Sequence, residues 1–196
     1  MSNVILTKEY EAPPVNKKEV LRYAGCKNAD AGVASLLDSC IEELSDKLVY
    51  KVCYCLLPLD ISGENVDLGN FSLSSGKLAL CLKGCKKAVV FAATVGIGPD
   101  RLVMRYGSTA AARALMLQAV GAERIETLCN SFCDDVAKEY GSVTPRFSPG
   151  YGDLSIETQK DIFAFLEPNK RIGLYLNDSM LMAPAKSVTA IFGIVE

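Results

Sequence analysis

The sequence predicts an α+β fold, in which helices pack around a mostly antiparallel or mixed twisted sheet. Apolar residues at helical spacing in 30–47 and 108–140 predict two long helices. The continuous apolar run 87–94 (KAVVFAAT) is typical of a buried central strand. The segments follow one another as helices, a few strands, helices and then strands. This order differs from the strict alternation of a doubly wound parallel sheet.

The elements of the first half follow from helix caps and from hydrophobic spacing. Asn16 followed by Glu19 resembles a capping box, and Gly25 is a suitable helix end. Pro58 places the end of its strand near a sheet edge or a bulge. We therefore expect an extended segment at 1–15, helices at 16–25 and 30–47, a strand at 48–59, a broken strand or hairpin arm at 66–73 and a small helix at 74–82.

The second half is divided by proline and glycine. Pro99 is well placed to open a helix, and Gly141 to close the long one. Both faces of the last strand are apolar, so we expect that strand to lie in the middle of the sheet. The expected elements are the strand 87–94, the long helix 108–140, a loop at 142–153, a helix at 155–166 and strands at 172–177 and 187–195.

Length and composition define the class of protein. With 196 residues, of which 49% are hydrophobic and 22% charged, we expect one domain, 1–196, with an ordinary core. The net charge of -2 argues against nucleic acid and anionic membranes as partners. No signal peptide or membrane-spanning run is visible, which predicts a cytoplasmic protein. The absence of histidine excludes Ser-His-Asp and Cys-His catalysis and histidine-ligated metals.

The chain has eight cysteines, which we expect to be free thiols in a reducing compartment. Cys81 and Cys85, like Cys129 and Cys133, are four residues apart, a spacing that places each pair on one face of a helix. Four thiolates would suit a zinc site. Both pairs occupy apolar positions, however, and this favours core thiols and no metal. A cysteine-rich metal or redox protein remains a third hypothesis.

Residues 96–98 (GIG) lie between an apolar strand and a helix, as in a dinucleotide-binding loop. The third glycine of that fingerprint is replaced by Arg101, and no acidic residue follows at the usual distance. The sequence favours a tight strand-to-helix turn without a ligand.

The strongest local signal is the segment 144–153 (TPRFSPGYGD). Its prolines restrict φ and its glycines allow unusual backbone angles, which predicts a loop of defined shape. Arg146 can bind a carboxylate or a phosphate through parallel hydrogen bonds, and Tyr151 offers a flat face and a hydroxyl. Glu126 lies beside the apolar stripe of the long helix, where a half-buried carboxylate needs a partner or a ligand. The alternative is a surface ion pair beside a packed tyrosine.

Residues 146–151 (RFSPGY) resemble the R-x-x-x-G-Y motif of the reactivation domain of cobalamin-dependent methionine synthase. The segment 177–188 (NDSMLMAPAKSV) is similar to that family's T-E-S-x-A-M-x-P-x-x-S-V stretch. The long helix that carries Glu126 also matches in length and position. The family's N-terminal Asp-Trp segment has no counterpart in this chain.

The resemblance implies a domain with the methionine synthase activation fold that binds S-adenosylmethionine. In that family the methyl group passes to cobalamin that a flavodoxin-like donor has reduced. By position, Arg146 would hold the methionyl carboxylate, Gly150 would let the backbone approach the ligand, and Tyr151 would lie beside the methyl group. Glu126 would be an acidic contact, and Phe192 with Gly193 would correspond to the family's aromatic pair.

The resulting hypothesis is a stand-alone reactivation module in a methyltransferase system of methionine biosynthesis. It would act on a separate cobalamin-dependent methionine synthase or another corrinoid protein, and cobalamin would be held only by that partner. We expect no catalytic acid or base, because reduced cobalamin is itself a strong nucleophile and needs only proximity to the methyl donor. The alternative is a non-catalytic adaptor for a corrinoid methyltransferase, in which the ligand is changed or lost.

Overall fold

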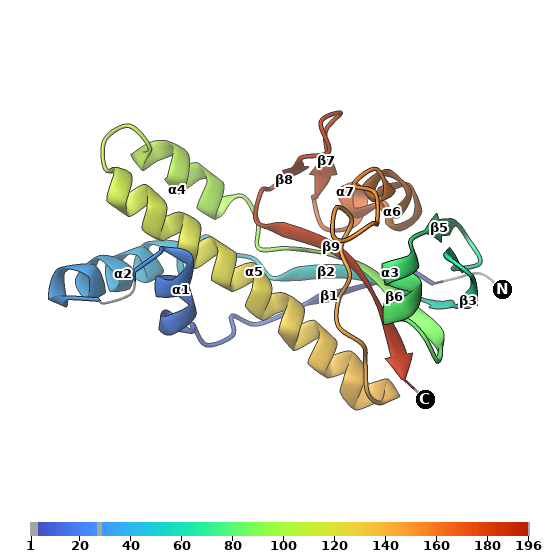
Figure 1. Ribbon diagram of the computed structural model, residues 1–196. Helices are drawn as coiled ribbons and strands as arrows, with labels where there is room; N and C mark the ends of the chain where they lie inside the picture. The colour runs from blue at the N-terminus through green and yellow to red at the C-terminus, as the bar shows by residue number, and fades with distance from the viewer. Residues whose placement is uncertain (1–3, 27–28, 196) are drawn as a thin grey trace.

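A four-stranded antiparallel sheet lies at the centre of the computed structural model, which describes residues 4–26 and 29–195 (Figure 1). The strand order is β1-β2-β6-β9, and every pairing in this sheet joins segments that are distant in sequence. The strands are β1 (Leu6–Glu9), β2 (Lys51–Pro58), β6 (Cys85–Thr94) and β9 (Ser187–Val195).

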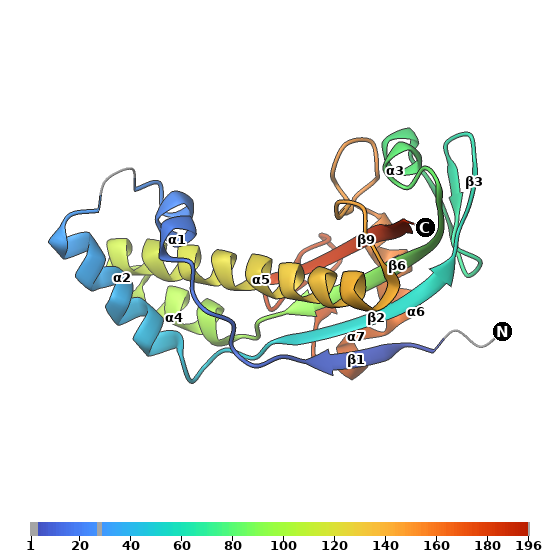
Figure 2. The same ribbon diagram turned by 90° about the horizontal axis from the view of Figure 1, so that it is seen from below.

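Helix α5 (Ala111–Tyr140) connects the two ends of the molecule. It has 30 residues and is therefore about 45 Å long. Its second half lies across one face of the sheet, and its first half packs with a group of three other helices (Figure 2). Those helices, which we call the helical lobe, are α1 (Lys17–Tyr23), α2 (Ala31–Leu44) and α4 (Gly98–Tyr106).

The sheet is buried on both faces, because successive side chains of a strand point to opposite sides. Phe91 of β6 and Phe192 of β9 point toward α5, where both rings pack against Phe132. Val90 and Ile191 point to the other face. That second face is covered by α3 (Gly76–Cys81) and α6 (Thr158–Leu166).

Two small sheets and a short helix complete the chain. They are β3 (Asp60–Ser62), β4 (Asn65–Asp67) and β5 (Ser72–Ser74) in one antiparallel sheet, β7 (Tyr175–Leu176) paired with β8 (Met182–Ala183), and α7 (Pro168–Arg171).

Side-chain caps confirm the predicted starts of three helices. The side chain of Asn16 accepts a hydrogen bond from the Glu19 backbone N–H at 3.3 Å. Asp30 and Ser75 cap α2 and α3 in the same way, at 2.8 and 3.0 Å. These contacts satisfy backbone N–H groups that have no partner within the helix.

A buried ion pair fixes the N-terminal segment to α5. Glu123 and Arg124 are 2% and 1% exposed, and Arg124 Nε donates to Glu123 at 2.6 Å. Arg124 also donates to the carbonyl oxygens of Pro13 and Pro14, at 2.5 and 2.9 Å. Glu123 accepts from the Asn16 backbone N–H at 3.0 Å. Both charges are therefore satisfied by the segment that leads into α1.

Two predictions about the sheet are wrong. β9 lies at the end of the strand order, and its outer edge is covered by the segment that follows α5. Apolar residues on both faces of a strand indicate that the sheet is covered on both sides. They do not indicate whether that strand lies in the middle or at the edge of the sheet. The predicted strand 172–177 is shortened to Tyr175–Leu176, because Pro168 opens α7 just before it.

Candidate functional site

The loop that follows α5 runs along the outer edge of β9. Phe147 and Ile191 form an antiparallel bridge, with N–H to O=C distances of 2.8 and 2.9 Å. The Thr144 N–H donates to the Gly193 carbonyl at 2.9 Å, and the Gly193 N–H donates to Thr144 Oγ1 at 2.9 Å. The loop thus replaces a fifth strand at this edge.

This strand-like path sends neighbouring side chains to opposite faces of the sheet. Phe147 enters the core under α3 and α6, whereas Arg146 reaches α5. Arg146 Nη2 donates to Glu126 Oε2 at 2.9 Å and to Asn130 Oδ1 at 3.0 Å. The Arg146 side chain is 22% exposed and that of Glu126 is 43% exposed. The pairing expected for a half-buried Glu126 is therefore present.

The other terminal nitrogen of Arg146, Nη1, is buried and has no hydrogen-bond partner among the described residues. A buried charged donor without a partner is costly and is uncommon in folded proteins. Nη2 is thus held by α5, whereas Nη1 is buried without a hydrogen bond. The same guanidinium lies near the buried Cys129 thiol and opposes the rise of its pKa.

The second half of the loop is attached to α3. Asp153 accepts hydrogen bonds from the Ser75 hydroxyl and from the Lys77 backbone N–H, the latter at 3.2 Å. These bonds, the one from Ser75 above all, hold the pKa of the Asp153 carboxyl below its ordinary value. Gly150 has φ of +84°, a value that favours glycine, and its N–H donates to the Leu154 carbonyl at 2.9 Å.

Tyr151 lies at the tip of this loop and is 67% exposed. Its ring packs edge-on against Phe147, with centroids 5.2 Å apart. The contact with Phe147 holds the Tyr151 ring in place and leaves most of that ring accessible to a ligand or partner.

A hollow of about 450 Å³ opens beside Arg146, between α5 and the loop. Burial raises the pKa of the Cys133 thiol to about 11, and Arg146 opposes this shift. That thiol is therefore neutral at pH 7. The hollow is lined by Asn130, Cys133, Asp134, Thr144, Pro145 and Arg146.

The structure brings some of the predicted site residues together and separates others. Arg146 contacts Glu126, and Gly150 and Tyr151 lie in the same loop. Phe192 is completely buried, with its ring centroid 5.8 Å from that of Phe91 and 6.0 Å from that of Phe132. Its ring is part of the core under α5 and does not line a surface site, which corrects the role expected for it.

Gly193 has a packing role that the sequence did not reveal. A Cβ at this position would lie 2.5 Å from Cys85 Sγ, so only glycine fits without a shift. Its backbone groups hold Thr144 in place. Gly193 therefore positions the loop through its backbone.

Two residues near Arg146 were not expected from the sequence to belong to the site: Asn130 and Asp134. Thr144, which also lines the hollow, begins the segment 144–153. Asn130 and Asp134 follow Glu126 at intervals of four residues, so the three lie along one side of α5. That spacing was visible in the sequence. Which side of α5 the loop would approach was not.

Only one of the two cysteine pairs predicted to share a helix face lies on a single helix. Cys129 and Cys133 lie on α5 as expected, but Cys81 ends α3 and Cys85 begins β6. Burial raises the pKa of Cys129 to about 12. Within residues 4–26 and 29–195, no three His, Cys, Asp or Glu side chains are grouped so that they could hold a metal ion.

The turn at 96–98 is packed closely against the end of the helical lobe. A Cβ on Gly98 would lie 2.2 Å from the Lys47 carbonyl oxygen, and one on Gly96 would lie 2.7 Å from Val49 Cγ2. Close approach of two backbones accounts for both glycines. This agrees with a structural turn.

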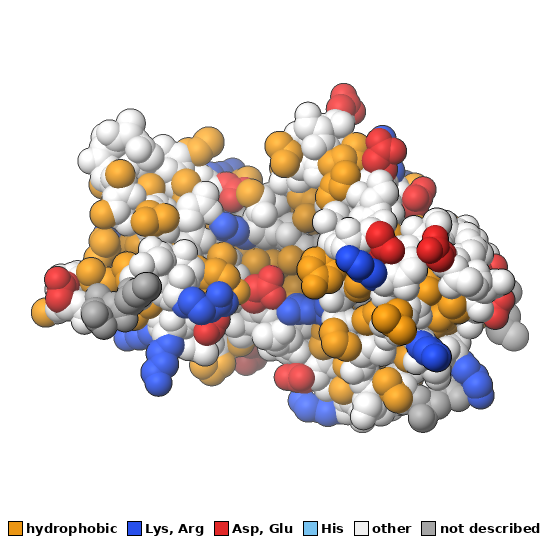
Figure 3. All heavy atoms as spheres, in the orientation of Figure 1, with side chains coloured by type: hydrophobic (Ala, Val, Ile, Leu, Met, Phe, Trp, Pro, Cys, Tyr) orange, Lys and Arg blue, Asp and Glu red, His pale blue; other side chains and the backbone are white. Residues whose placement is uncertain are grey.

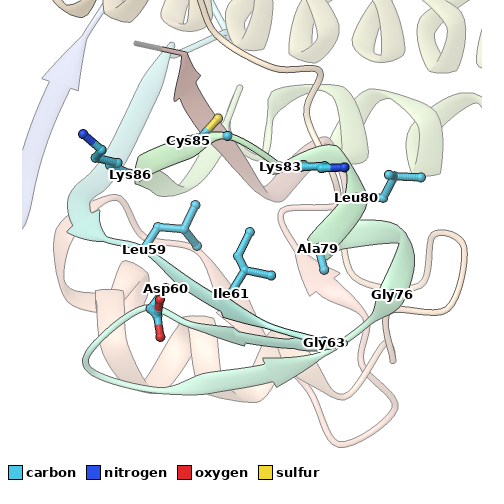
Figure 4. Close-up of a pocket in the computed structure, with 11 residues that line it drawn as sticks. Leu59, Asp60, Ile61, Gly63, Gly76, Ala79, Leu80, Lys83, Cys85 and Lys86 are labelled. Atoms are coloured by element: carbon cyan, nitrogen blue, oxygen red, sulfur yellow. The ribbon is translucent and has the colours of Figure 1, made fainter.

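A larger hollow, of about 590 Å³, lies between β3 and α3, far in sequence from the Arg146 loop (Figure 4). Leu59 and Ile61 point into it, whereas Asp60 points away. Lys83 and Lys86 also line it, but with Asp60 they lie on different sides of the hollow and do not converge on one point, as a site for a charged ligand requires. We regard the Arg146 loop as the better candidate site.

The face shown in Figure 3 is hollowed between the helical lobe and the part that carries the β7–β8 hairpin. Basic and acidic side chains are interspersed on this face, and no broad basic patch is visible there. None of the described helices has the combination of length and apolar character needed to cross a bilayer.

Comparisons with known proteins support the fold. No family model matches the chain, and no curated protein matches it. A crystal structure of the MetH reactivation domain bound to AdoHcy matches with a TM-score of 0.71 and 15% sequence identity. The match covers 97% of this chain and 78% of that one. The α+β class predicted from the sequence is confirmed, and the chain has the fold of the reactivation domain of cobalamin-dependent methionine synthase.

Proposed function

We propose that the chain binds S-adenosylmethionine at the Arg146 loop and supports reductive methylation of cob(II)alamin on a separate cobalamin-dependent methionine synthase. The observation that carries the proposal is the state of Arg146. Its guanidinium is oriented by Glu126 and Asn130, yet Nη1 is buried without a partner beside an open hollow. A ligand carboxylate would satisfy that nitrogen.

The fold supports the choice of ligand. The matching crystal structure contains AdoHcy, the product that remains when S-adenosylmethionine has given up its methyl group. Here, the R-x-x-x-G-Y loop is held at both ends, by β9 and by α3. A loop fixed in this way binds without a large ordering cost.

Each residue of the proposed site has a simple task. Arg146 binds the carboxylate, Gly150 allows close approach of the backbone, and the exposed ring of Tyr151 covers the ligand. Glu126 acts by orienting the guanidinium. No acid or base is required, because the corrinoid of the partner supplies the nucleophile and this chain supplies proximity.

The proposed partners follow from what the chain lacks. A chain without histidine cannot provide an imidazole ligand to cobalt. This supports a second protein as the holder of the corrinoid, with a flavodoxin-like donor to reduce it, as in the family that the sequence resembles. We place this encounter in the cytoplasm, where methionine is made.

The experiment is a reconstitution followed by visible spectroscopy. Partner loaded with cob(II)alamin is mixed with a reductant, S-adenosylmethionine and the chain, and formation of methylcobalamin is recorded. We expect methylation to require the chain and to fall at least tenfold, about 1.4 kcal/mol, with Arg146→Met combined with Tyr151→Ala. Lys138→Met, on the exposed side of α5, is the matched control. Equal rates without the chain would disprove the function.

The adaptor hypothesis is favoured by one observation. Phe192 is buried in the core, so the aromatic pair implied by the resemblance is not presented to a ligand. Binding of the chain to the corrinoid protein, with no binding of S-adenosylhomocysteine, would support a non-catalytic adaptor.

A further inference from the structure

The hollow beside Arg146 contains one cation and one anion, contributed by different elements. Arg146 comes from the loop, and Asp134 comes from α5. Both charges act on the Cys133 thiol, with opposite effects on its pKa, so they flank the same thiol. The hollow therefore carries charges of both signs in its lining.

The two acidic neighbours on α5 differ in their partners. Asp135 is paired with Lys8 and with Lys138. Asp134 is exposed, and no hydrogen bond or ion pair joins it to another residue in 4–26 or 29–195. Glu126, the other acid near Arg146, is already bound to the guanidinium. Asp134 is thus the carboxylate in this hollow that is available to a ligand.

Resting on the function proposed above, we propose that Asp134 is the specificity-determining residue for the ammonium group of the ligand. The α-amino acid end of S-adenosylmethionine is a zwitterion, with a carboxylate and an ammonium on the same carbon. Arg146 takes the carboxylate and Asp134 takes the ammonium, since both residues line the hollow. The hollow thus offers an opposite charge to each charge of the ligand's amino acid end.

The other lining groups suit this arrangement. Asn130 offers a neutral amide group, whereas the Thr144 hydroxyl is already bonded to the Gly193 N–H and to the Pro145 carbonyl. The Cys133 thiol stays protonated at pH 7, because burial raises its pKa to about 11, so it does not compete with Asp134 for the ammonium. Selectivity for the intact amino acid end therefore depends on one side chain.

The test compares three probes that lose one charge at a time. S-adenosylhomocysteine carries both charges, its deaminated analogue keeps only the carboxylate, and 5′-methylthioadenosine has neither. Binding to the full chain is measured by calorimetry. We expect the wild-type protein to prefer S-adenosylhomocysteine over the deaminated analogue by about tenfold, because an ammonium–carboxylate contact is a charge-assisted hydrogen bond.

Asp134→Asn should abolish that preference while it leaves the affinity for the deaminated analogue unchanged. Glu139→Gln removes an acidic group from the same helix outside the hollow and should keep the preference. Equal loss of affinity for both ligands in Asp134→Asn, or an unchanged preference, would overturn this assignment and leave the proposed function standing. Failure of the wild-type chain to bind S-adenosylhomocysteine would instead overturn the proposed function, and this inference with it.

Discussion

Arg146 Nη2 lies 2.9 Å from Oε2 of Glu126, and this contact joins the loop to a residue twenty positions earlier in α5. A 3.0 Å contact with Asn130, one turn further along the helix, holds the same nitrogen. The guanidinium is therefore fixed in orientation before any ligand arrives. Fixed donors lose less entropy on binding than mobile ones.

Replacing Arg146 tests whether this orientation serves binding. We expect Arg146→Met to weaken binding of S-adenosylhomocysteine by about ten- to a hundredfold, because a charge-assisted contact is worth roughly 1.5–3 kcal/mol. Lys138→Met removes an exposed cation from α5 and should leave affinity unchanged. Titration calorimetry measures both. Equal affinities of wild type and Arg146→Met would remove this residue from the site.

The buried pair Glu123–Arg124 should dominate the stability of the helical lobe. Arg124→Met leaves the carboxylate of Glu123 buried without its cation, at a cost of about 3–5 kcal/mol in the free energy of unfolding. Loss of the bonds to Pro13 and Pro14 adds to this effect. Urea unfolding measures the change.

A double variant, Glu123→Leu with Arg124→Leu, provides the comparison. It leaves no unpaired buried charge and should be less destabilised than Arg124→Met alone. A loss below about 1 kcal/mol in Arg124→Met would show that the pair behaves like an exposed one.

Asp153 should make attachment of the loop to α3 sensitive to acid. Its pKa is lowered in the folded state, chiefly by the Ser75 hydroxyl. Its contribution to stability is therefore present above its unfolded pKa, about 3.9, and is lost as the pH falls through the lower folded value. Asp153→Asn removes the titrating group.

Unfolding free energies of the wild type and Asp153→Asn are measured between pH 6 and pH 2. The difference between the two proteins should shrink as the pH falls below about 4. A difference that stays constant over this range would show that the carboxylate does not hold the loop.

The local structure was largely predictable from the sequence. Asn16, Asp30 and Ser75 begin helices because each side chain can bond an N–H three residues ahead, a contact that needs no distant partner. The bounds 187–195 predicted for the last strand were correct, because a continuous run of apolar residues indicates a buried strand without reference to any distant partner. The Arg146–Tyr151 loop was also identified, from the residues that give it shape and charge.

The positions of these elements relative to one another depended on the tertiary structure. The place of β9 at the sheet edge depends on hydrogen bonds to a loop more than forty residues earlier, and no local pattern encodes that pairing. Phe192 is buried because α5 crosses above it, although its position suggested a ligand contact. Asn130 and Asp134 lie beside Arg146 because the loop returns along one particular side of α5. Helical spacing determined which residues share a side of α5, and packing alone decided which side faces the site.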